Sequence, residues 1–192
     1  MTNDTTSTTQ THREVRHRRI AAGDARTALI RRRYDAPIED VWDACTNPER
    51  LRRWLSPVSG DLRVGGTFQM EGNAGGEILR CEAPRLLAVT WVYGDRPADE
   101  VELRLQPDDG GGTVLELEHA TVVEHAPMTI EGRPVDAILG VGIGWEMPLT
   151  YSLAVHLRGK PAQMPAGESP EAVAGRLAET WAALIEASRE SR

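Results

Sequence analysis

Residues 35–71 read DAPIEDVWDACTNPERLRRWLSPVSGDLRVGGTFQME, and this stretch decides the fold. Apolar side chains recur at helical spacing in its first part, and Asn47-Pro48-Glu49 has the residue types that begin a second helix. Gly65-Gly66 then indicates a tight turn between strands at 61–64 and 67–71. The stretch therefore predicts two short helices followed by a β-hairpin.

Strand patterns lie on both sides of this stretch. Residues 26–34 predict the first strand, and the run Arg31-Arg32-Arg33 within it indicates an edge or partly solvated strand. Apolar residues alternate with charged ones downstream and predict further strands at 77–83, 86–93, 101–105 and 115–118. Because the connections are short, we expect an antiparallel meander with one solvated face.

A long helical pattern follows Pro134. One face carries Ile138, Val141, Trp145, Leu149 and Leu153. The same segment contains three glycines and a proline, which are poor helix residues, so we expect a kink or a late helix start near Trp145.

These segments resemble the family named for the activator of the ninety-kilodalton heat-shock-protein ATPase, part of the START-like (SRPBCC) superfamily. The resemblance extends from about Arg26 to Gly159, and Gly144-Trp145-Glu146 is its downstream match. Its other matching residues are Ala36, Pro37, Val41, Trp42, Ala44, Thr46, Pro48, Leu51, Trp54, Pro57, Asp61, Arg63, Gly65, Gly66 and Phe68.

The resemblance implies an α+β helix-grip fold, in which a curved antiparallel sheet of six or seven strands surrounds the long C-terminal helix. It further implies a cavity between sheet and helix for an apolar or amphipathic small molecule. The residues with the phase and chemistry to line that cavity are Phe68, Met70, Trp91, Tyr93, Leu117, His119, Trp145 and Leu149. Core packing is the competing interpretation for each, and we favour it for Trp42 and Trp54.

Both ends of the chain extend beyond this START-like domain, which we place at 13–159. Residues 1–12 predict a disordered tail, and we interpret the arginines that follow, Arg13 to Arg19, as solvated rather than as a site for an anionic partner. Residues 160–168 predict a linker and 169–192 an additional helix. That helix packs either on the domain or on a second copy of the chain, as in a homodimer.

His119 is the most informative polar residue. It shares the inward phase of its strand with Leu117, so it fits a residue that orients a ligand or titrates near neutral pH, although we favour a satisfied core or rim histidine. Glu116 and Glu118 point to the opposite face, and His125 falls in a predicted loop. We therefore predict no metal site, and the sequence has no cofactor-binding motif.

Three functions follow, in order of preference. The first is a non-catalytic binding protein for a hydrophobic or amphipathic small molecule. The second is a polyketide cyclase- or aromatase-like enzyme, whose acid–base groups would come from His119, Glu77, Arg80 and Tyr93. The third is a regulator of a chaperone ATPase in a stress response, which the family name alone implies.

Composition bears on partners and location. A net charge of -7 argues against general nucleic-acid binding. No apolar run reaches the roughly 18 residues of a membrane span, and the N-terminus lacks a signal-peptide core, so we predict a cytoplasmic protein. Cys45 and Cys81 are in phase with apolar neighbours and are predicted to be buried free thiols.

Overall fold

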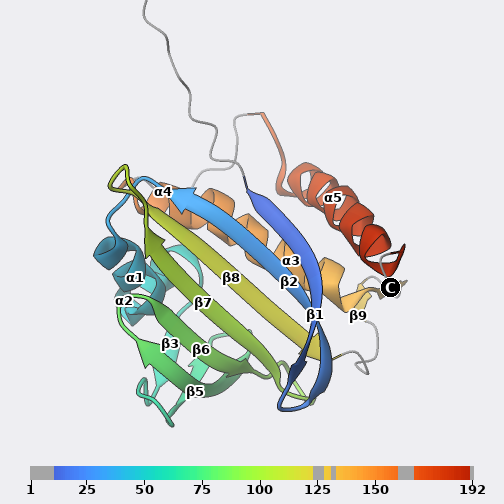
Figure 1. Cartoon of the computed structure of the whole chain (residues 1–192), viewed down its shortest axis with the longest axis horizontal. Coiled ribbons are helices and arrows are strands. Elements are labelled where there is room, and N and C mark those ends of the chain that lie inside the picture. The colour runs from blue at the N-terminus through green and yellow to red at the C-terminus, as the bar shows by residue number, and fades with distance from the viewer. Residues whose placement is uncertain (1–10, 123–127, 131–132, 160–166, 191–192) are drawn as a thin grey trace, which may run out of the picture.

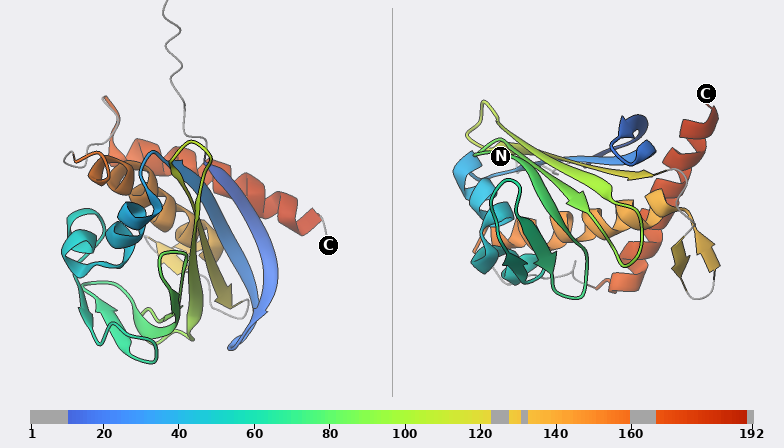
Figure 2. Two further views of the ribbon diagram at one scale, coloured as in Figure 1. Left: turned by 60° about the vertical axis from the view of Figure 1, so that its left-hand side comes forward. Right: turned by 90° about the horizontal axis from the view of Figure 1, so that it is seen from below.

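The computed structural model describes residues 11–122, 128–130, 133–159 and 167–190. Its main layer is a curved antiparallel sheet whose concave face surrounds a long helix (Figure 1), and a second helix crosses the first beside the sheet (Figure 2). The predicted helix-grip architecture is therefore confirmed. Of the expected tail over 1–12 and the expected linker over 160–168, residues 1–10 and 160–166 lie outside the described residues, and His12 already belongs to the first strand.

The sheet has eight strands, against the six or seven expected, in the order β1-β2-β8-β7-β6-β5-β4-β3. Their bounds are β1 His12–Ile20, β2 Gly23–Tyr34, β3 Val58–Gly60, β4 Thr67–Met70, β5 Gly75–Glu82, β6 Leu86–Trp91, β7 Asp99–Pro107 and β8 Thr113–Val122. A separate hairpin contains β9 Met128–Ile130 and β10 Arg133–Val135. All these pairs are antiparallel.

Strand β1 contradicts the interpretation of its arginines as solvated for Arg13 and Arg18, whereas Arg16 and Arg19 are exposed. Arg18 Nε donates to Glu118 Oε1 at 2.6 Å, and Arg13 forms an ion pair with the buried Glu146. Strand β1 pairs with residues 23–31 of β2, so β2 is interior there and the predicted edge position is wrong for Arg31. Arg32 and Arg33 lie beyond β1 and pair only with β8. Arg31 is exposed and forms an ion pair with Glu116 across the sheet surface, so this run is partly solvated, the other expected arrangement.

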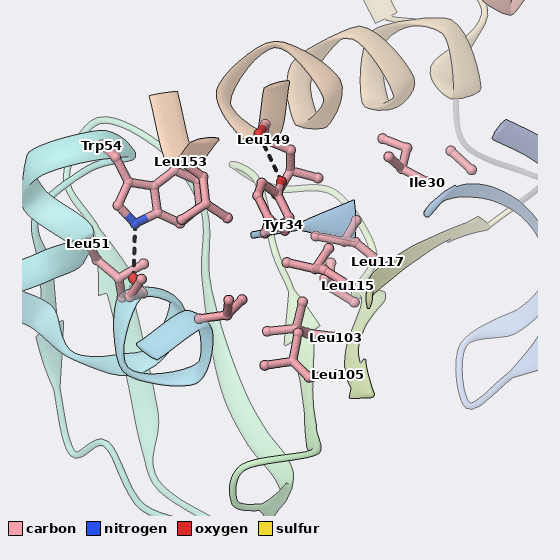
Figure 3. Close-up of a cluster of buried hydrophobic side chains, with 14 of the residues drawn as sticks. Ile30, Tyr34, Leu51, Trp54, Leu103, Leu105, Leu115, Leu117, Leu149 and Leu153 are labelled. Carbon is pink, nitrogen blue, oxygen red and sulfur yellow. Dashed lines mark hydrogen bonds between the residues drawn. The ribbon is translucent and has the colours of Figure 1, made fainter. Parts of the chain in front are cut away.

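The two predicted helices after β2 are α1 Ile38–Thr46 and α2 Pro48–Trp54. The Asn47 side chain caps α2 by accepting from the Glu49 backbone N–H at 3.0 Å. Trp54 is buried, and its indole N–H donates to the Ala44 carbonyl at 2.9 Å (Figure 3). Its assignment to the core is correct, whereas Trp42 packs against the core only partly buried.

A tight turn forms at the predicted place, since the Gly66 N–H donates to the Arg63 carbonyl at 2.9 Å, but the strand predicted at 61–64 before it is wrong. Strand β3 ends at Gly60, and residues 61–66 form a loop before β4. The two glycines also lie against β5, where the Gly65 N–H donates to the Ile78 carbonyl and the Ile78 N–H donates to the Gly66 carbonyl, at 2.8 and 2.9 Å. Positive φ at Gly65, 79°, allows this approach.

The long helix is continuous in space but changes its winding. Helix α3 Ala137–Met147 passes into a π-helical segment, η1 Pro148–Leu153, and then α4 Ala154–His156. The irregularity therefore begins at Pro148 rather than near Trp145, because proline has no N–H and crowds the preceding turn. The widened turn leaves the Leu149 carbonyl available to the Tyr34 hydroxyl, which donates to it at 2.8 Å (Figure 3).

The final helix, α5 Pro170–Glu190, packs on α3 and β1 of the same chain (Figure 1). Its buried residues are Val173, Leu177, Trp181 and Ile185. Trp181 lies directly on the backbone of Gly142, and its indole N–H donates to Glu146 at 3.0 Å. Of the two expected arrangements, α5 adopts packing on its own domain.

The segment Ala137–His156 is long and apolar enough to cross a membrane, by length and composition alone. In the fold it lies between the concave face of the sheet and α5 (Figure 2). Its Glu146 is buried in an ion pair with Arg13. We therefore describe it as the core helix of the domain.

Candidate functional site

An apolar cavity of about 370 Å³ lies between the sheet, α2 and the long helix. We call it the inner cavity. Its walls include Leu51, Trp54, Leu55, Val58, Phe68, Met70, Ile78, Leu87, Val89, Trp91, Val101, Leu103, Leu117, Trp145 and Leu149. Two polar groups at this wall are already used, since the Trp54 indole N–H and the Thr46 hydroxyl both donate to helix carbonyls. The inner cavity therefore suits an apolar body.

A second cavity of about 270 Å³ adjoins the inner cavity, and we call it the outer cavity. It is more polar, because Asn73, Tyr93, Arg96, Asp99, His119 and Thr121 line it. Gly140 and Gly144 of α3 form part of its wall. The sequence analysis expected one pocket, whereas the described residues form two compartments of different chemistry.

An aromatic pair lies at the boundary of the two cavities, where Leu55 and Met70 also line both. Trp91, at the end of β6, and Trp145, on α3, both line both cavities, with ring centroids 5.0 Å apart. We call this pair the partition. Phe68 packs on Trp91 from the inner side, with centroids 6.0 Å apart, and His119 lies 6.0 Å from Trp91 and 6.4 Å from Trp145.

A chain of hydrogen bonds holds the partition. The Trp145 indole N–H donates to His119 Nδ1 at 2.9 Å, and His119 Nε2 lies 3.1 Å from Asp99 Oδ2. The indole can only donate, so Nδ1 must be the unprotonated nitrogen and the proton of the neutral imidazole lies on Nε2. The other oxygen of Asp99 accepts the Val122 N–H at 3.2 Å. Both nitrogens of the buried His119 are thus engaged.

The fold brings all eight predicted lining residues to the two cavities. Phe68, Leu117 and Leu149 line the inner cavity, Tyr93 and His119 the outer, and Met70, Trp91 and Trp145 both. Tyr93 is exposed and lies at the rim of the outer cavity.

The acid–base set proposed for an enzyme is not assembled. Glu77 and Arg80 are exposed on β5 and line neither cavity, and Arg80 forms an ion pair with Glu82. Glu116 and Glu118 pair with arginines on the face opposite His119, as the strand alternation predicts. His125 lies outside the described residues.

Neither cysteine has the environment of a nucleophile. Burial raises the pKa of the Cys45 thiol at the inner cavity to about 12, so the thiolate is scarce near neutral pH. Cys81 is exposed, which contradicts the prediction of a buried thiol. A β-bulge between Ile78 and Arg80 shifts the alternation that the prediction used.

Asp99 was not among the predicted site residues, and it falls between the strands predicted at 86–93 and 101–105. Asp99 is the first residue of β7, opposite Trp91 across the β6–β7 pair. It shares its phase with Val101 and Leu103, so the alternation of that strand, extended by one step, would have found it.

The curved sheet, the long helix and the cavities between them define a START-like domain, a fold that binds small molecules. A family model described as activator of Hsp90 ATPase homolog 1-like protein matches residues 35–157, and the chain belongs to that family. Among curated proteins, none matches the chain.

Solved structures agree with this assignment. The crystal structure of CalU16 from Micromonospora echinospora is 47% identical, with a TM-score of 0.76, over 91% of this chain and 98% of CalU16. The solution structure of CalU16 has 44% identity and a TM-score of 0.78, over 95% and 99% of the two chains. PFC0360w, an HSP90 activator from Plasmodium falciparum, shares the fold at 22% identity and a TM-score of 0.54, over 63% of this chain and 88% of its own.

Proposed function

We propose that this protein binds a hydrophobic or amphipathic small molecule in the inner cavity, without catalysing a reaction. The observation that carries the proposal is the apolar wall of a cavity of about 370 Å³, within the size range of small-molecule sites. Two polar groups at that wall, on Thr46 and Trp54, hydrogen-bond within the protein, so an apolar occupant leaves them satisfied.

The cavity has a mouth suited to such a ligand. Leu62 and Val64, in the loop between β3 and β4, line the inner cavity and are 41% and 55% exposed. Cys81 on β5 is exposed at the same cavity. Apolar side chains at an opening provide a contact surface for an entering apolar molecule.

Two measurements test the proposal. Native mass spectrometry of freshly purified protein should detect a bound apolar molecule, or the protein should bind N-phenyl-1-naphthylamine, whose emission rises in apolar surroundings. In Leu87→Trp the larger ring occupies the inner cavity, and affinity for the naphthylamine should fall at least tenfold. Leu79→Trp is the matched control, because Leu79 is exposed on β5 and lines neither cavity. Equal binding by both variants would refute the assignment of the cavity.

The enzyme and chaperone-regulator alternatives have weaker support. His119 and Asp99 form a buried acid–base pair, but the Trp145 N–H occupies the nitrogen that a general base would use. Turnover of a polyketide-like substrate that is lost in His119→Ala would favour the enzyme. The HSP90 activator shares only the fold with this chain, so chaperone regulation rests on the family name.

A further inference from the structure

Building on the proposed function, we propose that the hydrogen bond from Trp145 to His119 sets the maximum length of ligand that the inner cavity accepts. His119 and Asp99 then act as positioning residues that determine specificity through Trp145. Ligands that end before the partition bind with the hydrogen bond intact, and longer ligands must break it.

The partition is too tight for a ligand to pass in its observed position. The centroids of Trp91 and Trp145 are 5.0 Å apart. An alkyl chain between two rings needs carbon contacts of about 3.5–4 Å on each side, so the rings would have to separate to roughly 7 Å. A ligand that extends from the inner into the outer cavity between the two rings must therefore displace one indole.

Trp145 is the indole with room to move. Gly140 and Gly144 lie four residues apart on α3, line the outer cavity and present no side chains there. The ring of Trp145 can therefore swing toward the outer cavity. Trp91 is more confined, because Phe68 and His119 pack on it from either side of the partition.

The acceptor that holds Trp145 is itself fixed. His119 is 3% exposed, and Asp99 Oδ2 lies 3.1 Å from the opposite ring nitrogen. Asp99 is anchored in turn by the Val122 N–H on β8. His119 therefore cannot follow the indole when it moves, and opening the partition loses the hydrogen bond outright.

The different chemistry of the two cavities further favours apolar ligands that end before the partition. A ligand that enters at the mouth formed by Leu62 and Val64 meets apolar walls as far as the partition. Beyond it lie Asn73, Tyr93 and Thr121 of the outer cavity. A purely apolar extension would thus gain little there and still break the hydrogen bond.

The test is a length series of straight-chain primary alcohols, from hexanol to tetradecanol, measured by isothermal titration calorimetry. For the wild type, affinity should rise with length, reach a maximum and then fall. Trp145→Phe keeps a ring but removes the donor, and His119→Phe keeps the indole but removes the acceptor. Both variants should move the maximum to longer alcohols and raise the affinity for the first alcohol beyond the wild-type maximum by roughly tenfold, the effect of one hydrogen bond.

The two variants together separate the hydrogen bond from simple enlargement of the cavity. A shift in Trp145→Phe without a shift in His119→Phe would show a volume effect and overturn the inference. An unchanged maximum in both would overturn it as well. Trp42→Phe is the matched control, because Trp42 lies on α1 and lines neither cavity, and its profile should equal that of the wild type. If the wild type binds no alcohol of the series and no N-phenyl-1-naphthylamine, the proposed function fails, and this inference fails with it.

Discussion

Replacing Gly142 by alanine tests how closely α5 packs on the core helix. A Cβ at this position would lie 2.4, 2.5 and 2.9 Å from three atoms of the Trp181 ring, where carbon atoms ordinarily approach to about 3.5–4 Å. The indole would have to retreat by about 1 Å. It is fully buried and hydrogen-bonded to Glu146, so the retreat has to be made by α5 as a whole.

The magnitude follows from two opposing effects. Overpacking of this kind costs about 1–3 kcal/mol, whereas alanine is favoured over glycine within a helix by about 1 kcal/mol. Gly144→Ala is the matched control on the same helix, because Gly144 is exposed and nothing lies within 4 Å of its added Cβ. The gain in helix propensity is common to both variants, so their difference in unfolding free energy isolates the clash and should be about 1–3 kcal/mol.

Urea denaturation followed by circular dichroism measures this difference. Gly144→Ala should be as stable as the wild type or more stable, and Gly142→Ala should be less stable than Gly144→Ala. Equal midpoints and slopes for the two variants would refute the close packing of Trp181 on Gly142. A lower slope in Gly142→Ala would show that α5 has detached before the rest of the domain unfolds.

Three further predictions follow from described contacts. Arg13→Ala leaves the buried carboxylate of Glu146 without its cation and should lower the unfolding free energy by about 3–5 kcal/mol. Arg16→Ala, at an exposed ion pair, should change the unfolding free energy by less than about 1 kcal/mol. Equal effects of the two substitutions would contradict the burial of the Arg13–Glu146 pair. Ellman's reagent at about pH 8 should modify Cys81 quickly and Cys45 much more slowly. Cys81 is exposed, whereas Cys45 is only partly accessible and burial raises its pKa to about 12. Equal rates for the two thiols would contradict this prediction. Burial, and then the charges of Arg50 and Arg53, lower the pKa of His156 below its ordinary 6.5. Below pH 6.5 the folded state therefore binds fewer protons than the unfolded state. Stability that is present above pH 6.5 is lost as the pH falls. Urea midpoints should therefore fall less for His156→Gln than for the wild type between about pH 7 and about pH 5.5, and parallel pH profiles would contradict the lowered pKa.

The fold could be predicted where local chemistry and family pattern agree. The helix pair with its Asn47 cap and the apolar face of α5 both follow from residue types at fixed spacings. Strand β1 could not be found in this way, because its arginines hide the alternation of a strand. Their partners, Glu118 and Glu146, are 100 and 133 residues away in the sequence, and only the folded sheet brings them together.

The candidate site, too, could be predicted only in part from the sequence. The family resemblance implied an interior site between sheet and helix, and the phase of each strand and of the long helix selected Trp91, Leu117, His119 and Trp145 for its walls. The division of that site into two cavities depends on the 5.0 Å approach of two indoles and on the pairing of β6 with β7. Both are tertiary distances that a periodic pattern does not contain.

The buried carboxylate of Glu146 determines which segments of the chain a stable fragment must contain. Its partners are Arg13 near the start of the chain and Trp181 near the end, whereas the family pattern matches only residues 35–157. A fragment trimmed to the matched segment would keep the acid and lose both groups that neutralise or solvate it. The flanking strand β1 and helix α5 therefore supply both partners of a charge that is buried in the segment between them.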